Sequence, residues 1–295
     1  MVTMAEKRNV LITGASSGIG RRLLEEFCRD EFRVLATVRQ PRLDAFKQEL
    51  TGKYSNVVPY ILDVTDLERG TEVIRDVESR FGPIDILINN AAISYRTVVE
   101  EMSGPDEAIQ MATNYFGPMH LVRMVLPGMR SKKSGHIINI SSVGGMMAMP
   151  TMSAYSASKF ALEGASESLW YEVRPFGIHV TLVRPGFINS DAFRKVKYGE
   201  DTNIEDKKGV YYFHYHHMSG FIEKLMTRTP CTPESAARMI YKISCMKNPP
   251  MRIAGTPDAR FFAILRRILP RRFYHWLLYR SLPGIKNWGK DGNRE

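Results

Sequence analysis

The sequence predicts an α/β protein with one doubly wound parallel sheet of about seven strands and helices on both faces. Two patterns lead to this prediction. Short β-branched runs alternate with longer stretches of helical periodicity, which is typical of successive βαβ units. The short runs are also almost continuously apolar, as strands are when helices cover both faces of their sheet. Right-handed crossovers between such strands produce a doubly wound sheet.

These patterns assign the elements in chain order. Strands are predicted at residues 9–13, 33–38, 57–62, 84–89, 136–141 and 179–183, with a short one near 251–254. Helices are predicted over 20–30, 66–81, 106–129 and 154–176. Residues 189–232 follow the sixth strand and lack regular periodicity. Because open parallel sheets bind ligands at the carboxyl ends of their strands, we expect this segment to be a long loop that acts as a lid or substrate wall.

Two parts of different composition divide the 295 residues. Residues 1–255 hold all the predicted strands and form one domain, and residues 256–295 form a basic amphipathic extension. From residue 260 onward nine Lys and Arg stand against two acids, which accounts for +7 of the net charge of +10. Apolar residues recur there at helical spacing, namely Phe261, Ile264, Leu265 and Ile268. Pro270 should interrupt this helix, and residues 273–278 resume it.

The basic extension has two interpretations. It either lies on an anionic membrane, or packs over the substrate site or a partner subunit with its arginines in water. Nucleic-acid binding is not expected, because no recognised motif accompanies the charge. Cys28, Cys231 and Cys245 are far apart, which indicates a reducing compartment. With no apolar run of about 20 residues and no signal-peptide pattern, we expect a cytoplasmic protein, or one that associates with a membrane through its extension.

A glycine-rich turn follows the first predicted strand and opens the first helix. Glycines permit a tight turn and a close approach of the backbone to a pyrophosphate, and the helix N-terminus offers free N–H groups to the anion. A flexible turn without a ligand would contain the same glycines, but the strand–turn–helix context favours a dinucleotide site. The candidate cofactor-binding residues of this turn are Gly14, Ser16, Ser17, Gly18, Ile19 and Gly20.

The end of the second predicted strand indicates which dinucleotide binds. NAD sites place Asp or Glu there, where the carboxylate binds the ribose 2′-hydroxyl. This chain has Thr37-Val38-Arg39 instead, and a guanidinium is well suited to a 2′-phosphate. The sequence therefore predicts NADP(H) in preference to NAD(H). The alternative for Arg39 is a solvated surface charge.

Tyr155 and Lys159 stand four residues apart in a predicted helix, so they share one helix face. A phenol has an ordinary pKa near 10, which is too high for efficient acid–base chemistry at neutral pH. A nearby ammonium, together with the positive charge of an oxidised nicotinamide, would favour the phenolate and lower the pKa of Tyr155. The spacing therefore indicates an acid–base pair, although either residue alone could be a packed aromatic or a surface charge.

The motifs resemble those of the short-chain dehydrogenase/reductase family over residues 8–255. The resemblance rests on the G-x-x-x-G-x-G turn, on Asn89-Asn90-Ala91-Ala92 after the fourth strand, and on Tyr155 with Lys159. It implies a Rossmann fold. It also implies further cofactor-binding residues, with the adenine near Asp63 and the nicotinamide carboxamide after the sixth strand: Asp63, Val64, Asn90, Pro185, Gly186 and Ile188. Ala92 stands where the family usually has glycine, and we expect its methyl group to be tolerated.

The resemblance also implies a catalytic set. Tyr155 would be the general acid of a carbonyl reduction, and Ser142 would donate a hydrogen bond to the substrate oxygen. Ser141 is its neighbour and rival, but the thirteen-residue spacing to the tyrosine favours Ser142. Lys159 would hold the nicotinamide ribose, and Asn114 would keep a water beside that lysine. Tyr155 and Lys159 would thereby contact the cofactor as well.

The sequence therefore predicts an NADPH-dependent oxidoreductase that acts on a carbonyl or secondary alcohol and, as the family often does, forms a homo-oligomer. The alternative is a dinucleotide-sensing or membrane-peripheral regulatory protein without turnover. A pliable apolar pocket would suit a lipophilic ketone or aldehyde of steroid, retinoid or acyl type. Its expected lining is Met146, Met147, Met149, Met152, Phe187, Phe193, Tyr198, Tyr211, Tyr212 and Phe213. No metal site is expected at His214, His216 and His217, because no Cys or carboxylate accompanies them at ligand spacing.

Overall fold

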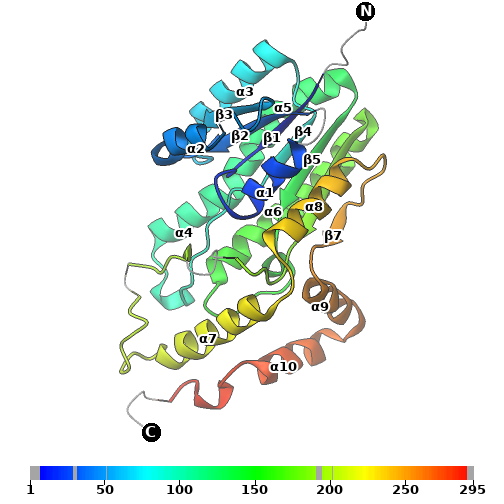
Figure 1. Cartoon of the computed structure of the whole chain (residues 1–295). Helices are drawn as coiled ribbons and strands as arrows, with labels where there is room; N and C mark the ends of the chain where they lie inside the picture. The colour runs from blue at the N-terminus through cyan, green and yellow to red at the C-terminus, as the bar shows by residue number, and fades with distance from the viewer. Residues whose placement is uncertain (1–6, 29–31, 51, 191–194, 201, 291–295) are drawn as a thin grey trace, which may run out of the picture.

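Seven strands form one parallel sheet in the order β3-β2-β1-β4-β5-β6-β7 (Figure 1). The computed structural model describes residues 7–28, 32–50, 52–190, 195–200 and 202–290. The strands are β1 (Arg8–Ile12), β2 (Phe32–Val38), β3 (Val57–Ile61), β4 (Ile86–Asn89), β5 (Gly135–Ile140), β6 (Ile178–Arg184) and β7 (Arg252–Ala254). Each predicted strand lies within two residues of the observed one. The predicted α/β sheet is confirmed.

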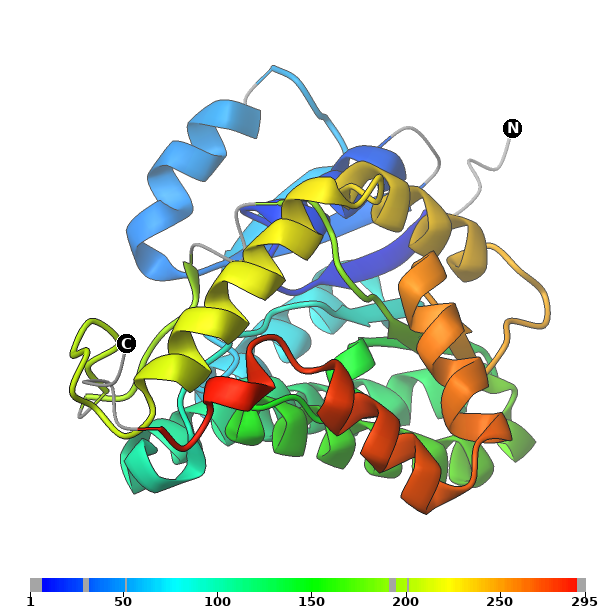
Figure 2. The same ribbon diagram turned by 90° about the horizontal axis from the view of Figure 1, so that it is seen from below.

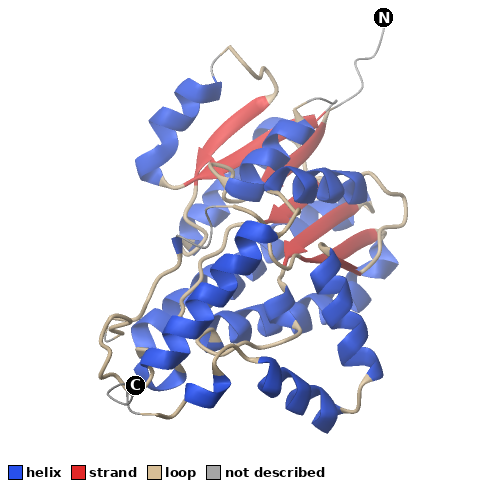
Figure 3. Ribbon diagram, turned by 60° about the horizontal axis from the view of Figure 1, so that its bottom comes forward, coloured by secondary structure: helices blue, strands red, loops and turns tan. Residues whose placement is uncertain are grey.

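Helices cover both faces of the sheet (Figure 3). One face carries α1 (Gly18–Phe27), α2 (Leu43–Leu50) and α8 (Pro233–Ser244). The other carries α3 (Leu67–Phe81), α5 (Gly117–Lys132) and α6 (Ser153–Val173). Because side chains alternate along a strand, β1 feeds both cores. Val10 and Ile12 pack under the first layer and Leu11 packs under the second, and all three are completely buried.

The strand order reverses at β1, which has β2 on one side and β4 on the other. All seven strands are parallel, so their carboxyl ends lie along one edge of the sheet. At a reversal of this kind the connections leave in opposite directions and open a crevice between the strand ends. The segments that follow β1, β4, β5 and β6 therefore meet at this edge.

The helix predicted over 106–129 is interrupted. It consists of α4 (Gly104–Met111), a π-helical turn at Ala112–Phe116, and α5. Such turns inside helices often occur at functional sites because the extra residue redirects a side chain, and Asn114 lies in this one. Short 3₁₀ helices occupy Gln40–Arg42, Val99–Glu101, Val143–Gly145, Arg174–Phe176 and Ile285–Asn287.

The expectation of an irregular loop over 189–232 is wrong for its second half, which forms α7 (Tyr212–Arg228). The buried side chains of α7 are Tyr215, Met218 and Ile222, a narrow stripe at helical spacing. Histidines and tyrosines around this stripe weaken the apolar periodicity of the sequence.

The extension beyond β7 folds into α9 (Pro257–Ile268) and α10 (Arg271–Ser281), which Pro270 separates as expected. The inner sides of both helices pack on the main domain, where Ala259 and Tyr274 join Val143, Met146 and Met147 in one apolar cluster. In Figure 2 the extension crosses the underside of the molecule beside α7. Within the described ranges, no helix is both long enough and apolar enough to cross a bilayer.

Candidate active site

Ser142, Tyr155 and Lys159 lie together beyond the end of β5. Ser142 follows the strand in extended conformation and accepts a hydrogen bond from the Gly144 backbone N–H at 3.0 Å. Its side chain also lowers the pKa of the Tyr155 phenol, against the larger effect of burial. Lys159 stands one turn further along α6, with its Nζ atom 5.9 Å from the centre of the Tyr155 ring. The structure thus brings the predicted serine, tyrosine and lysine into one cluster.

Burial dominates the electrostatics of this cluster. It lowers the pKa of Lys159 from its ordinary 10.5 to about 8, against the opposing effect of the Glu163 carboxylate. The Lys159 ammonium donates to the Ile140 carbonyl at 2.9 Å. Burial also raises the pKa of Tyr155, against the hydrogen bond from Ser142, which lowers it. Desolvation therefore raises the pKa that the sequence analysis expected to be lowered, and Tyr155 is a neutral phenol that can donate a proton.

Glycines allow the serine and tyrosine to approach each other. A Cβ atom on Gly144 would lie 3.0 Å from Cε1 of Tyr155, and one on Gly145 would lie 2.6 Å from Oγ of Ser141. The backbone after β5 must therefore pass directly beneath the tyrosine ring. Ser141 Oγ is buried and has no hydrogen-bond partner within the described chain, whereas Ser142 contacts the tyrosine. The geometry favours Ser142 over its neighbour.

Asn114 connects three segments around the cluster. Its Oδ1 atom accepts from the Ile93 N–H at 2.9 Å, and its Nδ2 atom donates to the Ile93 carbonyl at 3.0 Å and to Ser158 Oγ at 3.1 Å. The π-helical turn aims this side chain at the loop after β4 and at α6 simultaneously. Asn114 thereby fixes the position of the helix segment that carries Tyr155 and Lys159.

The glycine-rich turn between β1 and α1 has the geometry of an anion cradle. Gly14 and Gly18 adopt left-handed backbone conformations, with φ of +68° and +55°. A Cβ on Gly20 would lie 2.3 Å from the Gly14 carbonyl oxygen, so only glycine fits there. Ser17 is the N-cap of α1, yet its side chain makes no capping hydrogen bond. The first N–H groups of α1 are thus available to an anion, which fits a dinucleotide pyrophosphate; Ser16 and Ile19 lie in the same turn.

Thr13 links this turn to the segment after β4 and was not predicted. Its Oγ1 atom accepts from the N–H groups of Asn90 and Ala91 at 2.9 and 3.0 Å, and its carbonyl accepts from Asn90 Nδ2 at 2.9 Å. A hydroxyl at the end of the first strand was the available sequence signal. Asn90 is therefore held by hydrogen bonds to Thr13, at the start of the glycine-rich turn. Ala92 is exposed without a left-handed backbone, so its methyl group causes no conformational strain.

The predicted adenine-end residues lie at neighbouring strand ends. Arg39 follows β2, is exposed, and pairs with no carboxylate of the described chain. Asp63 follows β3 and accepts hydrogen bonds from the N–H and hydroxyl of Thr65 at 3.0 and 2.7 Å. Val64 is buried, and its carbonyl oxygen would lie 2.3 Å from a Cβ on Gly117. Because β2 and β3 are parallel neighbours, Arg39 and Asp63 place a cation and a carboxylate at the same edge of the sheet.

The loop after β6 is held by the C-terminal extension. The Gly186 N–H donates to Thr256 Oγ1 at 2.8 Å, and the Phe187 N–H donates to Asp258 at 3.0 Å. The Pro185 carbonyl accepts from the Val143 N–H at 2.8 Å, and Ile188 is buried. The sequence analysis did not identify Thr256 or Asp258, because they lie about 70 residues from the loop.

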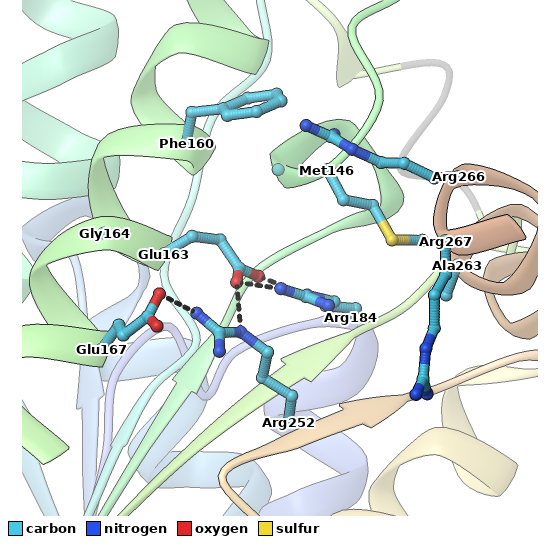
Figure 4. A pocket seen from close by; sticks show the side chains of 11 residues that line it. Met146, Phe160, Glu163, Gly164, Glu167, Arg184, Arg252, Ala263, Arg266 and Arg267 are labelled. Atoms are coloured by element: carbon cyan, nitrogen blue, oxygen red, sulfur yellow. Dashed lines mark hydrogen bonds and ion pairs between the residues drawn. The ribbon is translucent and has the colours of Figure 1, made fainter. Parts of the chain in front are cut away.

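A buried carboxylate joins α6 to the last two strands. Glu163 lies one turn after Lys159 and accepts from Arg184 Nε at 2.7 Å and from Arg252 Nε at 3.3 Å. Arg252 also donates to Glu167 at 2.6 Å. Figure 4 shows this network at the base of a surface cavity of about 460 Å³. The network ties the helix of Tyr155 and Lys159 to β6 and β7.

The described residues of the expected apolar lining divide into three groups. Met149, Met152 and Phe187 join Tyr155 in a cluster completed by Met218 and Ile222 of α7 and by Leu282 and Trp288 beyond α10. Met146 and Met147 instead pack under the extension. Tyr211, Tyr212 and Phe213 lie at the start of α7, in ring contacts with histidines, and Tyr198 contacts Tyr215. Phe193 lies outside the described residues. Tyr155 thus lies in an apolar cluster to which α7 and the C-terminal segment contribute.

Comparisons with known proteins agree with this geometry. A family model described as short chain dehydrogenase matches residues 8–201. The 3-ketodihydrosphingosine reductase of Bacteroides thetaiotaomicron is 36% identical over 275 residues, which cover 91% of this chain and 96% of the relative. A short-chain dehydrogenase from Streptomyces avermitilis superposes with a TM-score of 0.78 at 32% identity, covering 93% of this chain and 97% of that one. ElxO with NADP bound superposes with a TM-score of 0.68 at 28% identity, covering 84% and 95%.

Proposed function

The chain belongs to the short-chain dehydrogenase/reductase family, and we propose that it is an NADPH-dependent reductase of long-chain lipophilic ketones. The observation that carries this proposal is the Ser142–Tyr155–Lys159 cluster beside an apolar wall. Family membership supports an oxidoreductase with a nicotinamide cofactor. The choice of NADPH and of the substrate is our inference from the residues below.

The residues of the strand ends suit an NADP(H) dinucleotide. The Gly14–Gly20 turn and the free N–H groups of α1 would hold the pyrophosphate. Arg39 would pair with the 2′-phosphate, since no neighbouring carboxylate competes for its guanidinium within the described chain. The loop of Pro185, Gly186 and Ile188 would hold the carboxamide. When bound, the cofactor supplies the hydride for carbonyl reduction.

The side chains of the Ser142–Tyr155–Lys159 cluster would position the substrate oxygen and transfer a proton to it. Ser142 donates a hydrogen bond to the substrate oxygen and so places it beside the Tyr155 hydroxyl. Tyr155 gives its proton to that oxygen as negative charge develops there. The Lys159 ammonium then stabilises the phenolate that remains, because opposite charges attract strongly where water is excluded. Asn114 acts through α6 by holding Ser158 and Ile93 in place.

The apolar wall supports a long-chain substrate. Met149, Met152, Phe187 and Met218 surround Tyr155 with thioethers and an aromatic ring, which adapt to flexible acyl chains. The relative named as a 3-ketodihydrosphingosine reductase supports the acyl type over a rigid steroid or retinoid. We therefore propose a substrate with the ketone close to one end of a long alkyl chain, which would lie against this apolar wall.

Exposed aromatics on the helices beside the site support a homo-oligomer. Phe116, Phe160 and Tyr171 are 52%, 39% and 62% exposed, which is unusual for large side chains of a monomer when they lie on neighbouring helices. Burial of these side chains against a second copy would remove them from water.

NADPH oxidation tests the reductase proposal. We expect wild type to oxidise NADPH with 3-ketodihydrosphingosine or another long-chain 3-ketone, and Tyr155→Phe to lose turnover by at least 100-fold while it still binds NADPH. Arg39→Gln should weaken NADPH binding about tenfold and leave NADH binding nearly unchanged. Turnover of short ketoacids alone would exclude the lipophilic substrate. Cofactor binding with no turnover on any ketone would favour a regulatory protein instead.

A further inference from the structure

The outer side of α9 carries an exposed apolar stripe. Phe261, Ile264 and Ile268 repeat at helical spacing and are 58%, 51% and 70% exposed. Arg260 and Arg267 are exposed on the same helix, and their positions in the 3.6-residue repeat lie beside the stripe. This helix therefore presents both apolar and cationic side chains to its surroundings.

The following helix has the same character with aromatic residues. Phe273, Trp276 and Tyr279 of α10 are 47%, 52% and 59% exposed. The rings of Phe273 and Trp276 stack with centroids 5.5 Å apart, and the Arg280 guanidinium lies 5.6 Å from the centre of the Trp276 indole. Aromatic side chains with an arginine between them are typical of membrane–water interfaces.

Packing inside the molecule does not account for these side chains. The opposite sides of the two helices supply Ala259, Leu265 and Tyr274 to the cluster around Met146 and Met147. The helices are therefore anchored by their inner sides. The outer apolar residues are free to contact a partner.

The positive charge of the extension indicates that its partner is anionic. From Ala259 to Lys290 the chain has eight Lys and Arg and no acid. Arg266 and Arg267 also border the 460 Å³ cavity between α6 and α9 (Figure 4). In that cavity Arg184 and Arg252 are neutralised by Glu163 and Glu167, whereas neither α9 arginine meets a carboxylate within the described ranges. The surface thus attracts anions.

We propose that α9 and α10 form a docking surface for a bilayer that contains anionic lipid. The apolar stripes enter the boundary between head groups and acyl chains, and the arginines contact phosphates while their stems stay in the apolar layer. A second copy of this chain is a poorer occupant, because two surfaces of the same positive charge would repel each other. Figure 1 places both helices at the end of the molecule opposite α3.

Docking would bring the apolar cluster around Tyr155 close to the bilayer. Leu282 and Trp288, which follow α10 in the chain, belong to this cluster. A long-chain ketone could then pass from the bilayer to Tyr155 along the extension. This consequence rests on the proposed reductase function, whereas the docking itself does not depend on any activity.

Vesicle binding of the full-length protein tests the proposal. Wild type should sediment with vesicles of phosphatidylcholine and phosphatidylglycerol, and binding should be at least tenfold weaker with phosphatidylcholine alone. Ile264→Gln with Arg267→Gln should weaken binding about fiftyfold, from about tenfold for the lost apolar contact and about fivefold for the lost charge. The matched control is Leu67→Gln with Arg75→Gln on α3, which removes the same kinds of exposed side chain and should bind as wild type does.

Fluorescence identifies the contacting surface. Bromine-labelled acyl chains should quench the emission of wild type, and most of the quenching should disappear in Trp276→Phe, which keeps the apolar contact. Equal binding of the α9 and α3 double variants would overturn the proposal, as would the absence of binding to anionic vesicles. A wild-type dimer that only Ile264→Gln with Arg267→Gln dissociates would assign the surface to a second copy and overturn it as well. Each readout is independent of turnover.

Discussion

At the scale of single residues, Lys159 combines a charge with nearly complete burial. Its side chain is 3% exposed, and desolvation lowers its pKa to about 8. The Ile140 carbonyl, the Glu163 carboxylate and the face of the Tyr155 ring compensate the ammonium in the described structure. A cation kept in such a place destabilises the fold. Residues of active sites often carry this kind of penalty, because the chemistry requires the charge.

The destabilisation caused by the buried Lys159 ammonium can be measured through the pH dependence of the free energy of unfolding. The folded pKa of Lys159 lies below the unfolded value of 10.5, so wild type is penalised below pH 8 and regains stability as the pH rises from 8 to 10.5. Lys159→Met removes the titrating group. The variant should therefore gain stability over wild type mainly at low pH. The free energy of unfolding of Lys159→Met minus that of wild type should be about 2–3 kcal/mol larger at pH 7 than at pH 10.

Urea unfolding at the two pH values checks this expectation, with Lys224→Met on the exposed surface of α7 as the control. A difference between Lys159→Met and wild type that does not change with pH would show that burial of the ammonium is not what limits stability.

At the scale of elements, the extension contributes to the cofactor side of the site through the start of α9. Thr256 is the N-cap of α9, and its hydroxyl accepts from the Ala259 N–H and from the Gly186 N–H. Asp258, in the first turn, accepts from Phe187. A Cβ on Gly186 would collide with this carboxylate. The loop after β6 and the helix α9 therefore form one hydrogen-bonded unit, although the sequence analysis assigned them to different parts of the chain.

Thr256→Val should separate the two roles of this cap. The change leaves the partly buried Gly186 N–H unpaired and removes the helix cap, so we expect the free energy of unfolding to fall by about 1–3 kcal/mol. The affinity for NADPH should fall about fivefold or more as the loop loses its anchor. Urea unfolding and cofactor titration measure the two effects.

Thr232→Val provides the comparison, because Thr232 caps α8 and holds no loop of the site. It should lose about 1 kcal/mol of stability and keep its NADPH affinity. If both variants lost cofactor affinity equally, the loop anchor would not explain the effect.

At the scale of the whole molecule, α7 and the C-terminal segment pack together in the apolar cluster around Tyr155. Trp288 lies over His214 with ring centroids 4.3 Å apart, and His217 lies close to Gly284. Gly284 has a left-handed backbone, with φ of +63°. The chain therefore turns sharply after α10 and returns across α7. As a result, residues of α7 and residues that follow α10 share one apolar cluster with Tyr155.

A chain that ends at Ser281 should retain its fold and lose part of this wall. The Thr256, Ala259 and Tyr274 contacts remain in this variant. Loss of Leu282 and Trp288 should raise the KM for a long-chain ketone about tenfold or more, because an apolar contact of this size contributes about 1–3 kcal/mol. Steady-state kinetics with ketones of increasing chain length measure the change.

The KM for short ketones and the affinity for NADPH serve as internal controls and should change less than twofold. A uniform loss across all chain lengths would indicate that the segment supports the catalytic cluster rather than the substrate wall.

Much of the site follows from the sequence because its signals are local. The order of the strands, the turn from Gly14 to Gly20 and the four-residue step from Tyr155 to Lys159 depend on spacing within one element or one connection. A parallel sheet brings strand ends to one edge regardless of loop length. Ser142 and Asn114 were assigned to the neighbourhood of Tyr155 by the resemblance to the family, without knowledge of any contact.

Only the tertiary structure decided how the extension and α7 complete the site. Thr256 reaches Gly186 across 70 residues, and Trp288 reaches His214 across a similar distance in the chain. Contacts of this kind depend on where two finished elements pack, which local periodicity does not encode. The same reason explains why Met146 and Met147 lie beneath the extension instead of facing the substrate. By itself the sequence determined the sheet, the glycine-rich turn and the shared helix face of Tyr155 and Lys159; the packing of α7, α9 and α10 determined what surrounds them.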